Sequence, residues 1–252
     1  MVPLIVPTVN PSHLSVVHAQ RASLTPSPDK GFIVTNANCS TTGLVVPLAA
    51  LEAAFGPIDK CLVTTLQAIS GGGYPGVPSM DILDNLVPYI GGEEEKIEWE
   101  TSKILGGVLP DKSGFDYHKS SPITVSANCN RVAVIDGHTE CVSVSFVNRP
   151  APSPEQVAEV MRKYTTLANE LGKEKVPSAP ENPIVVTEEQ DRPQPRLDRN
   201  VQDGACVVVG RIRECQVLDI KFVALSDNVR IGAATSSIIN AELAVAQGVV
   251  VV

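Results

Sequence analysis

The sequence has little positive charge and no long hydrophobic run. Its 252 residues include 20 Lys and Arg against 28 Asp and Glu, which gives a net charge of −8. A surface that binds nucleic-acid phosphates needs clustered basic side chains, so we expect no nucleic-acid partner. No apolar stretch reaches the roughly 18 residues that a membrane-spanning helix requires. Residues 1–11 contain three prolines and no basic residue, unlike a signal peptide, so we expect a cytoplasmic protein with no membrane partner.

The cysteines form no Cys-x-x-Cys pair, and half of them lie inside apolar runs. Free buried cysteines behave as small hydrophobic residues, and this pattern is typical of a reducing compartment. We therefore expect free thiols rather than a disulfide framework, and no metal site. The six are Cys39, Cys61, Cys129, Cys141, Cys206 and Cys215.

Short apolar runs bounded by Pro, Gly and Asn predict most of the secondary structure. The predicted strands are residues 2–7, 31–36, 61–69, 122–127, 131–136, 139–147, 205–215 and 216–225, the last two as a hairpin. The predicted helices are residues 40–55, 93–105, 154–172 and 232–247, and the Pro-rich segments 175–183 and 188–200 are predicted loops. Most neighbouring strands lack an intervening helix. This favours an α+β fold with a mixed, largely antiparallel sheet packed with helices.

Cys39 stands where a predicted strand passes through a polar turn into a helix, in the segment TNANCSTTG. A thiol at a helix start meets the positive end of the helix dipole and free backbone N–H groups, which stabilise a thiolate. The same N–H groups could receive an oxyanion. A nucleophilic thiol also needs a base, and among four histidines His138 follows a turn glycine that could aim it into a cleft. A cysteine hydrolase, or a small residue at a helix start with no chemical role, fits these two residues equally well.

Six motifs extend this reading along the whole chain. They are TNANCSTTGLVVPL, TTLQAISGGGYPG, GEEEKIEWETSKIL, NCNRVAVIDGHTE, QPRLDRN and VGRIRE, in this order. Together they resemble the aspartate-semialdehyde dehydrogenases, in particular their fungal and archaeal-like branch. The resemblance implies NADP-dependent, reversible reductive dephosphorylation of L-aspartyl 4-phosphate to L-aspartate 4-semialdehyde through a thioacyl intermediate. It also implies a homodimer or homotetramer in the pathway to threonine and methionine.

The resemblance assigns roles residue by residue. It makes Cys39 the acylated thiol, His138 the acid/base, and Gln67 the residue that orients the covalent intermediate. Substrate would be bound by Arg131, Glu100, Lys103 and Asn38, with Arg131 on the carboxylate, Glu100 on the ammonium and Lys103 on the phosphate. Glu100 and Lys103 are three apart on a helix and could instead be a solvated ion pair. The cofactor would lie near Ser70, Gly71 and Asn228, and near the run Gly232-Ala233-Ala234.

The family's glycine-rich dinucleotide-binding segment has no counterpart in this sequence. We therefore expect residues 1–35 to be a remnant of a doubly wound α/β cofactor domain. Residues 36–226 would form the catalytic and dimerisation domain, and residues 227–252 a C-terminal helix that packs onto the cofactor domain. The chain resembles a truncated enzyme that would turn over poorly. The alternatives are a non-catalytic dimerisation module or a related N-acetylglutamyl-phosphate reductase. Preferential alkylation of Cys39 by iodoacetamide would favour the enzyme over the module.

Overall fold

A six-stranded mixed sheet organises the chain, in a computed structural model that describes residues 1–23, 31–119 and 121–250. The strand order is β4-β3-β5-β8-β7-β6, and β3 pairs in parallel with β4 and antiparallel with β5. The strands are β3 (Ile58–Gln67), β4 (Thr124–Arg131), β5 (His138–Phe146), β6 (Ile184–Val186), β7 (Val207–Glu214) and β8 (Ile220–Ser226). β7 and β8 form the predicted antiparallel hairpin. The predicted fold class, an α+β fold with helices packed on a mixed sheet, is confirmed.

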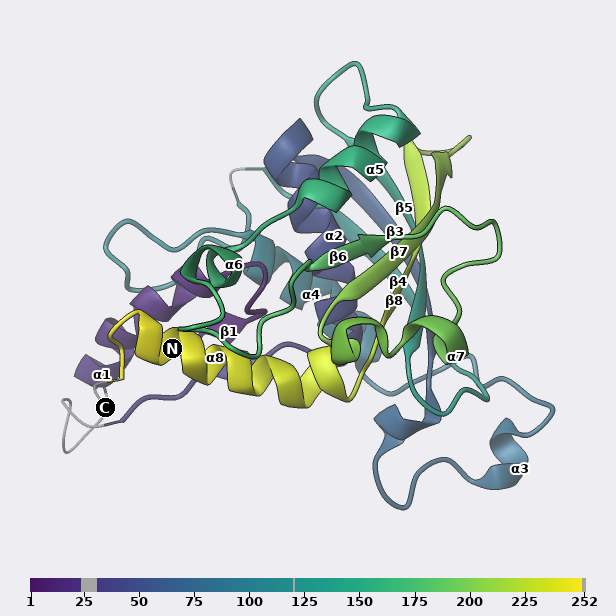
Figure 1. The fold of residues 1–252 in the computed structure, drawn as a ribbon, viewed down its shortest axis with the longest axis horizontal. Coiled ribbons are helices and arrows are strands. Elements are labelled where there is room, and N and C mark those ends of the chain that lie inside the picture. The colour runs from purple at the N-terminus through teal and green to yellow at the C-terminus, as the bar shows by residue number, and fades with distance from the viewer. Residues whose placement is uncertain (24–30, 120, 251–252) are drawn as a thin grey trace.

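Three helices, α2 (Cys39–Phe55), α4 (Glu93–Leu105) and α5 (Pro154–Lys163), contact the sheet on one side (Figure 1). The shorter helices are α1 (Val17–Ser23), α3 (Ser79–Ile82), α6 (Leu167–Leu171) and α7 (Pro195–Asp198). The 3-10 turns are Pro11–Val16, Ile69–Gly72 and Val201–Gly204, and a π turn, Arg230–Ala234, leads into α8 (Thr235–Ala246). Among the described residues, no helix is both long enough and apolar enough to cross a membrane.

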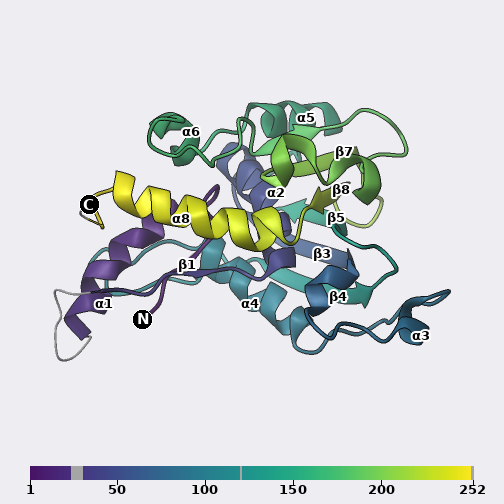
Figure 2. The same cartoon turned by 60° about the horizontal axis from the view of Figure 1, so that its bottom comes forward.

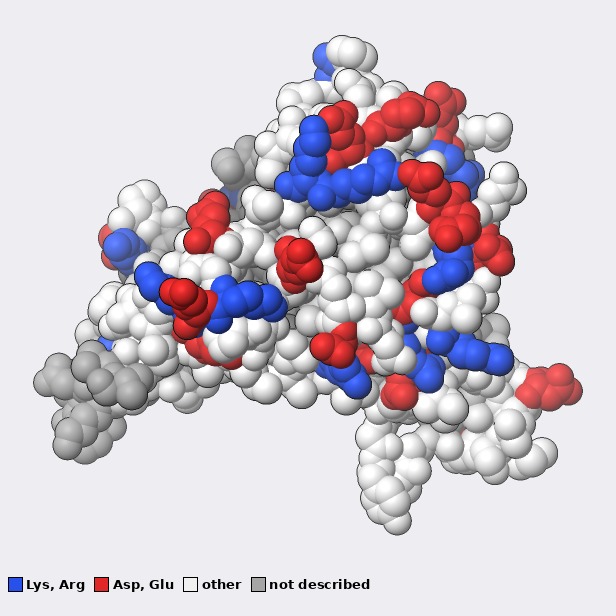
Figure 3. Space-filling view, viewed as in Figure 1, with Lys and Arg blue, Asp and Glu red and all other residues white. Residues whose placement is uncertain are grey.

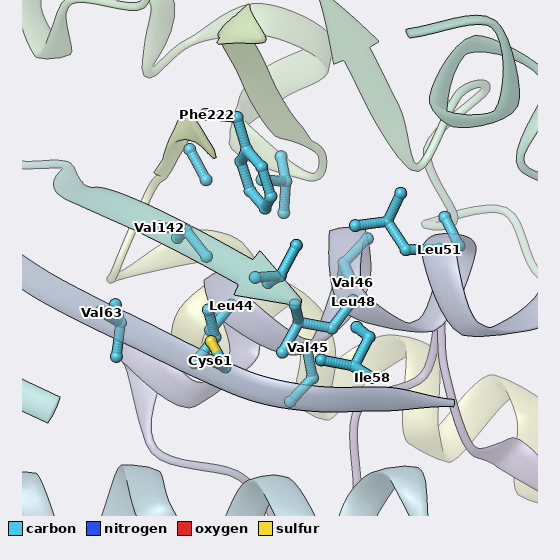
Figure 4. Packing of buried hydrophobic residues seen from close by; sticks show 14 of the residues in the cluster. Leu44, Val45, Val46, Leu48, Leu51, Ile58, Cys61, Val63, Val142 and Phe222 are labelled. Atoms are coloured by element: carbon cyan, nitrogen blue, oxygen red, sulfur yellow. The ribbon is translucent and has the colours of Figure 1, made fainter. Parts of the chain in front are cut away.

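The main core lies between α2 and the sheet. Leu44, Val45, Leu48 and Leu51 of α2 are fully buried, and Figure 4 shows them facing strands β3, β5 and β8. A helix that is apolar on nearly every side belongs in an interior, which explains why α2 runs through the middle of the fold. Truncating one such leucine to alanine is expected to cost about 2–5 kcal/mol of stability. The helix that carries Cys39 is therefore firmly held.

A second apolar cluster joins the two ends of the chain. Strand β1 (Leu4–Ile5) pairs in parallel with β2 (Thr35–Asn36), and α8 lies across this end of the molecule (Figure 2). Ile5, Leu14, Ile239 and Leu243 are fully buried there. Residues 24–30 of the predicted remnant 1–35, and the last two residues of the predicted segment 227–252, lie outside the described residues. The domain boundaries themselves stay predictions.

Four predicted strands and helices differ clearly from the structure. Residues 131–136 are not a strand; β4 ends at Arg131, and residues 132–137 connect it to β5 on the other side of β3. The helix predicted over 154–172 is two helices, because Tyr164 turns to an extended conformation and its hydroxyl donates to Thr8 O at 2.9 Å. Thr166 then caps α6. The strands predicted over 2–7 and 31–36 shrink to two residues each.

Charged side chains of both signs mix on the face seen in Figure 3, mainly around the sheet and α5. The surface over α8 is nearly free of charge, since Glu242 is the one ionisable side chain in that helix. No broad field of one sign covers this face of the molecule.

Candidate active site

Cys39 is the first residue of α2, and Asn38 is its N-cap. The Asn38 side-chain oxygen accepts from the backbone N–H groups of Ser40 at 2.9 Å and Thr41 at 3.2 Å. An asparagine here suits a helix start, because its short amide satisfies N–H groups that lack a partner within the helix. Asn38 therefore engages both groups, and the N–H groups of Ser40 and Cys39 also lie close enough to the thiol to stabilise its charge.

His138, the first residue of β5, meets that thiol. Its Nε2 lies 3.3 Å from Cys39 Sγ, and the side chain is fully buried. Its Nδ1 accepts a hydrogen bond from the Ala68 backbone N–H at 3.1 Å. A backbone N–H can only donate, so in the neutral imidazole the proton lies on Nε2 and points at the sulfur. The ring is thus held as a hydrogen-bond donor to Cys39.

The sheet topology brings two more predicted residues to the same place. β3 and β4 are parallel and β5 is antiparallel to them, so Gln67 and Arg131 end their strands where His138 begins β5. Arg131 Nη1 donates to Ala68 O at 2.6 Å, directly beside the N–H that holds the imidazole. Gln67 is 1% exposed and Arg131 6%. Three residues far apart in sequence, Gln67, Arg131 and His138, therefore lie at the end of the sheet where the partly buried Cys39 thiol meets His138.

The electrostatics of the pair differ from the expectation of a stabilised thiolate. Burial, and next the charge of Glu93, raise the pKa of Cys39 to about 11, although the backbone N–H groups of Ser40 and Cys39 oppose this. Burial, and then the neighbouring Arg131 guanidinium, lower the pKa of His138 to about 3. The free site therefore holds a neutral thiol and a neutral imidazole. Desolvation outweighs the helix-start effect, because the thiolate loses its hydration when it is buried.

The same burial bears on the expected alkylation of Cys39. The thiol whose pKa is lowered is Cys215, which lies at the β7–β8 turn, accepts from Leu218 N–H and sits near Lys221. Thiolate character and access control alkylation. We now expect Cys215 to react before Cys39 in the free protein, so preferential alkylation of Cys39 is a poor marker of its role.

Glu93, at the start of α4, is a site residue that the sequence reasoning missed. Both of its carboxylate oxygens accept from Asn38 Nδ2, at 2.9 and 2.8 Å, and one also accepts from Gln67 Nε2 at 3.3 Å. Lys96 lies 3.4 Å from the same carboxylate. This Glu-x-x-Lys pair has the spacing of Glu100 and Lys103 and precedes it by one heptad. The repeated Glu-x-x-Lys spacing was the sequence signal that could have identified Glu93 as a candidate.

Glu100 and Lys103, the pair that the sequence resemblance assigned to substrate, have different contacts in the structure. Glu100 is buried, and its Oε2 accepts from the Asn38 backbone N–H at 2.8 Å, so it supports the turn that carries Cys39. Lys103 donates to Val2 O at 3.1 Å and lies over the rings of Trp99 and Phe115. Their substrate roles stay predictions, and the contacts place Lys103 in a different environment from the thiol.

The residues expected near the cofactor form one edge of this site. Asn228 Nδ2 donates to Ser70 Oγ at 2.9 Å, and its oxygen accepts from Gly137 N–H at 2.9 Å. A Cβ on Gly71 would lie 2.9 Å from Arg131 Nη1 and 3.2 Å from the imidazole, and a Cβ on Gly232 would lie 2.9 Å from Cys39 Cβ. The backbone of these two glycines thus packs directly against the thiol, the guanidinium and the imidazole, where any side chain would collide with them. This edge of glycine backbone with the polar Ser70 and Asn228 side chains fits a nicotinamide.

Known proteins with this sequence pattern and fold define the class. Residues 48–231 match the family model described as semialdehyde dehydrogenase, dimerisation domain. An aspartate-semialdehyde dehydrogenase of Cryptococcus neoformans is 66% identical over 248 residues, which cover 98% of this chain and 67% of that protein. The enzyme of the same name from Saccharomyces cerevisiae is 55% identical, with 99% of this chain and 68% of that protein covered.

The crystal structure of a Candida albicans aspartate-semialdehyde dehydrogenase with NADP superposes with a TM-score of 0.88 at 52% identity. The match covers 99% of this chain and 68% of that one. The chain belongs to the aspartate-semialdehyde dehydrogenase family, and it spans about two thirds of the length of these relatives. The family resemblance stated from the six motifs is confirmed.

Proposed function

We propose that this chain carries the thiol chemistry of NADP-dependent reductive dephosphorylation of L-aspartyl 4-phosphate to L-aspartate 4-semialdehyde. The observation that carries the proposal is the Cys39 Sγ–His138 Nε2 contact of 3.3 Å at a helix start. A hydrolase needs a base that removes the thiol proton. His138 presents an N–H to the sulfur, which suits an acid better than a base.

In the acylation step, the Cys39 sulfur attacks the acyl carbon of the aspartyl phosphate and the C–O bond to phosphate breaks. The thiol proton leaves to solvent or to the departing phosphate, since His138 Nε2 already carries hydrogen. Before the attack, the thiolate formed in this way accepts a hydrogen bond from that Nε2–H. The negative oxygen of the tetrahedral intermediate meets the Cys39 backbone N–H at the helix start.

The reduced cofactor NADPH, when bound along Ser70, Gly71 and Asn228, would supply the hydride that reduces the thioester. His138 Nε2–H then lies beside the acyl carbon attached to Cys39 and stabilises the oxygen that gains charge there. As the aldehyde C=O forms from this oxygen, the C–S bond breaks, and the departing Cys39 thiolate again accepts the hydrogen bond from His138 Nε2–H. Gln67, anchored to Thr65 and Glu93, holds the acyl group in place.

Recognition of the aspartyl group follows from the charges around the thiol. Arg131 offers a planar guanidinium for the α-carboxylate. Glu93, in contact with Asn38 and Gln67, is the carboxylate best placed for the substrate ammonium, and Lys96 beside it is the cation for the phosphate. We assign these roles to Glu93 and Lys96 in preference to Glu100 and Lys103.

The test is single-turnover acylation of the 252-residue chain by L-aspartyl 4-phosphate. Mass spectrometry should find one aspartyl thioester on Cys39, with release of one phosphate, and Cys39→Ser should show neither. Cys215→Ser is the matched control, because it removes a more exposed thiol and should acylate normally. A chain that folds and binds the substrate without acylation would identify a non-catalytic assembly module. NADPH binding is measured separately by fluorescence.

We further propose a homodimer that forms on the sheet face opposite α2, in a protein of the cytoplasm. Leu62 is 45% exposed there, and Cys141, Ser143 and Val223 line the same open face. This uncovered sheet face mixes apolar and polar side chains, a composition that occurs in interfaces between subunits, so it is suited to pairing with a second copy. Sedimentation velocity should give a dimer for the native chain and a monomer for Leu62→Asp. Val217→Asp, at the exposed β7–β8 turn, should stay dimeric.

A further inference from the structure

Glu140 is a buried carboxyl group that the proposed mechanism does not use. It lies on β5 two residues beyond His138, on the same face of the strand, and is 1% exposed. Within the described part of the chain, neither of its carboxylate oxygens has a hydrogen-bond partner. Burial raises the pKa of Glu140 well above its ordinary value. Burial thus favours the neutral, protonated carboxyl, and that form has one O–H to donate.

The surroundings of Glu140 connect it to the turn that carries the thiol. Gly43 lies one helical turn after Cys39, and a Cβ there would be 3.2 Å from Glu140 Oε1 and 2.6 Å from Ser226 Oγ. Ser226 is 2% exposed, and its hydroxyl also lacks a partner among the described residues. It is the residue that pairs with His138 across β5 and β8. Two buried polar groups from neighbouring strands thus meet α2 at one point.

Glu140 and Ser226 are not hydrogen-bonded to each other in this structure, but the cost of leaving both without a partner favours a small side-chain movement that would join them. A buried polar group without a partner costs about 1–3 kcal/mol, and here both groups face the same small space beside Gly43. A neutral carboxyl can donate to a hydroxyl oxygen, whereas an ionised one cannot. The absence of a side chain at Gly43 keeps that space free, so the carboxyl and the hydroxyl both approach the backbone of α2 there.

We propose that Glu140 is a positioning residue for Cys39 and His138: as a neutral acid it donates to Ser226 Oγ and supports α2 at Gly43. Its ionisation would place a negative charge beneath the thiol. The titratable groups that face it are Cys39 on α2, Cys61 on β3, Cys129 on β4 and His138 on β5. Burial raises the pKa of each of these thiols, and negative charge on Glu140 raises each further.

The Cys39 pKa is thus lower beside a neutral Glu140 than beside an ionised one, so the thiolate forms more easily while Glu140 is neutral. This proposal rests on the nucleophilic role of Cys39 in the proposed function, but it does not depend on the substrate.

The experiment compares the native chain with Glu140→Gln, which keeps the shape and a donor but cannot ionise. Alkylation of Cys39 by iodoacetamide is followed by site-resolved mass spectrometry from pH 7 upward. The two proteins should react equally at neutral pH. At alkaline pH the Gln variant should react about tenfold faster, because a neighbouring like charge shifts a pKa by about one unit. Glu95→Gln, an exposed position on α4, is the control and should follow the native profile.

Infrared difference spectra give a second readout. The native chain at neutral pH should show the carbonyl band of a protonated carboxyl that Glu140→Gln lacks, and Ser226→Ala should shift that band. Coincident alkylation profiles for the native chain and Glu140→Gln would overturn the proposal. So would an ionised Glu140 at neutral pH, or an unshifted band in Ser226→Ala, which is the decisive variant if Glu140→Gln fails to fold. None of these readouts needs acyl phosphate, so failure of acylation would count against the proposed function alone.

Discussion

Helix α4 carries two Glu-x-x-Lys pairs one heptad apart, and they lie in different environments. In the first pair, Glu93 contacts side chains of Asn38 and Gln67 and stays beside Lys96. In the second, Glu100 binds the Asn38 backbone while Lys103 contacts Val2. Identical spacing thus gives one pair with joined side chains and one pair that is split. Helical periodicity predicts that two residues share a face, but not which turn of that face meets the site.

The largest expected difference between the pairs is in acylation. Glu93→Gln should lower the second-order rate of acylation by L-aspartyl 4-phosphate ~100-fold or more, because a buried charge that pairs with the substrate ammonium is lost. Glu100→Gln should cost less than tenfold, since the amide oxygen can still accept from Asn38 N–H. Single-turnover phosphate release measures both. The reverse order of effects would return the ammonium to Glu100.

Substitution of Lys96 should affect substrate binding, whereas substitution of Lys103 should affect stability. Lys96→Met should raise the concentration of acyl phosphate needed for half-maximal acylation by ~10-fold, as loss of one charge contact of about 1.4 kcal/mol would. Lys103→Met should leave that concentration unchanged and lower the melting temperature, because its contacts are with Val2 O and two aromatic rings. Equal effects of the two variants on substrate dependence would place Lys103 in the site after all.

Asn38 contacts both glutamates, so two substitutions can separate its roles. Asn38→Ser keeps an N-cap acceptor for α2 but loses the amide that donates to Glu93. It should retain stability and lose acylation rate. Asn38→Ala should lose both, with a stability cost of about 1 kcal/mol, the usual value for an N-cap. Urea unfolding of the two variants checks this, and equal stabilities would show that the cap contributes little.

The smallest expected effect is the pH dependence that Glu100 adds to stability. Burial raises the pKa of Glu100 above its ordinary value. A carboxyl whose folded pKa is raised favours the folded state at low pH and loses that contribution as pH rises through the folded pKa. Glu100→Gln should therefore gain stability relative to the native chain between pH 4 and pH 7. Glu95→Gln is the control for removal of a charge, and a relative loss by Glu100→Gln at pH 7 would contradict the assignment.

Local sequence signals predicted the parts of the fold that local chemistry determines. The helix 93–105 has the bounds of α4, and the hairpin 205–225 has the pairing of β7 and β8. The strand predicted over 131–136 is wrong, because these alternating apolar residues lie mainly in the connection between β4 and β5. Tyr164 ended the helix 154–172 early through a contact with Thr8, which is distant in sequence. Tertiary contacts overrode periodicity in both cases.

The site residues that lie in sequence motifs at turns could be predicted from the sequence. Those whose role depends on tertiary contacts could not. Cys39, His138, Gln67 and Arg131 do meet, and the strand ends that carry them are visible as motifs. Glu93 could not be chosen over Glu100 without the fold. The raised pKa of Cys39 was also beyond local reasoning, since it follows from burial under elements that the turn sequence does not contain.

The length of the connection between Arg131 and His138 determines how these two site residues lie relative to each other. β4 and β5 flank β3, so residues 132–137 must cross two strand spacings, about 10 Å. They are not free in doing so: Val132 N–H donates to Gln67 O, and Val134 O and Ile135 O accept from Ile69 and Ser70 N–H. The crossing is thus aligned with the chain that leaves β3. Substitution of its side chains leaves this alignment intact, whereas insertion or deletion of one residue would move the imidazole relative to both the guanidinium and the thiol.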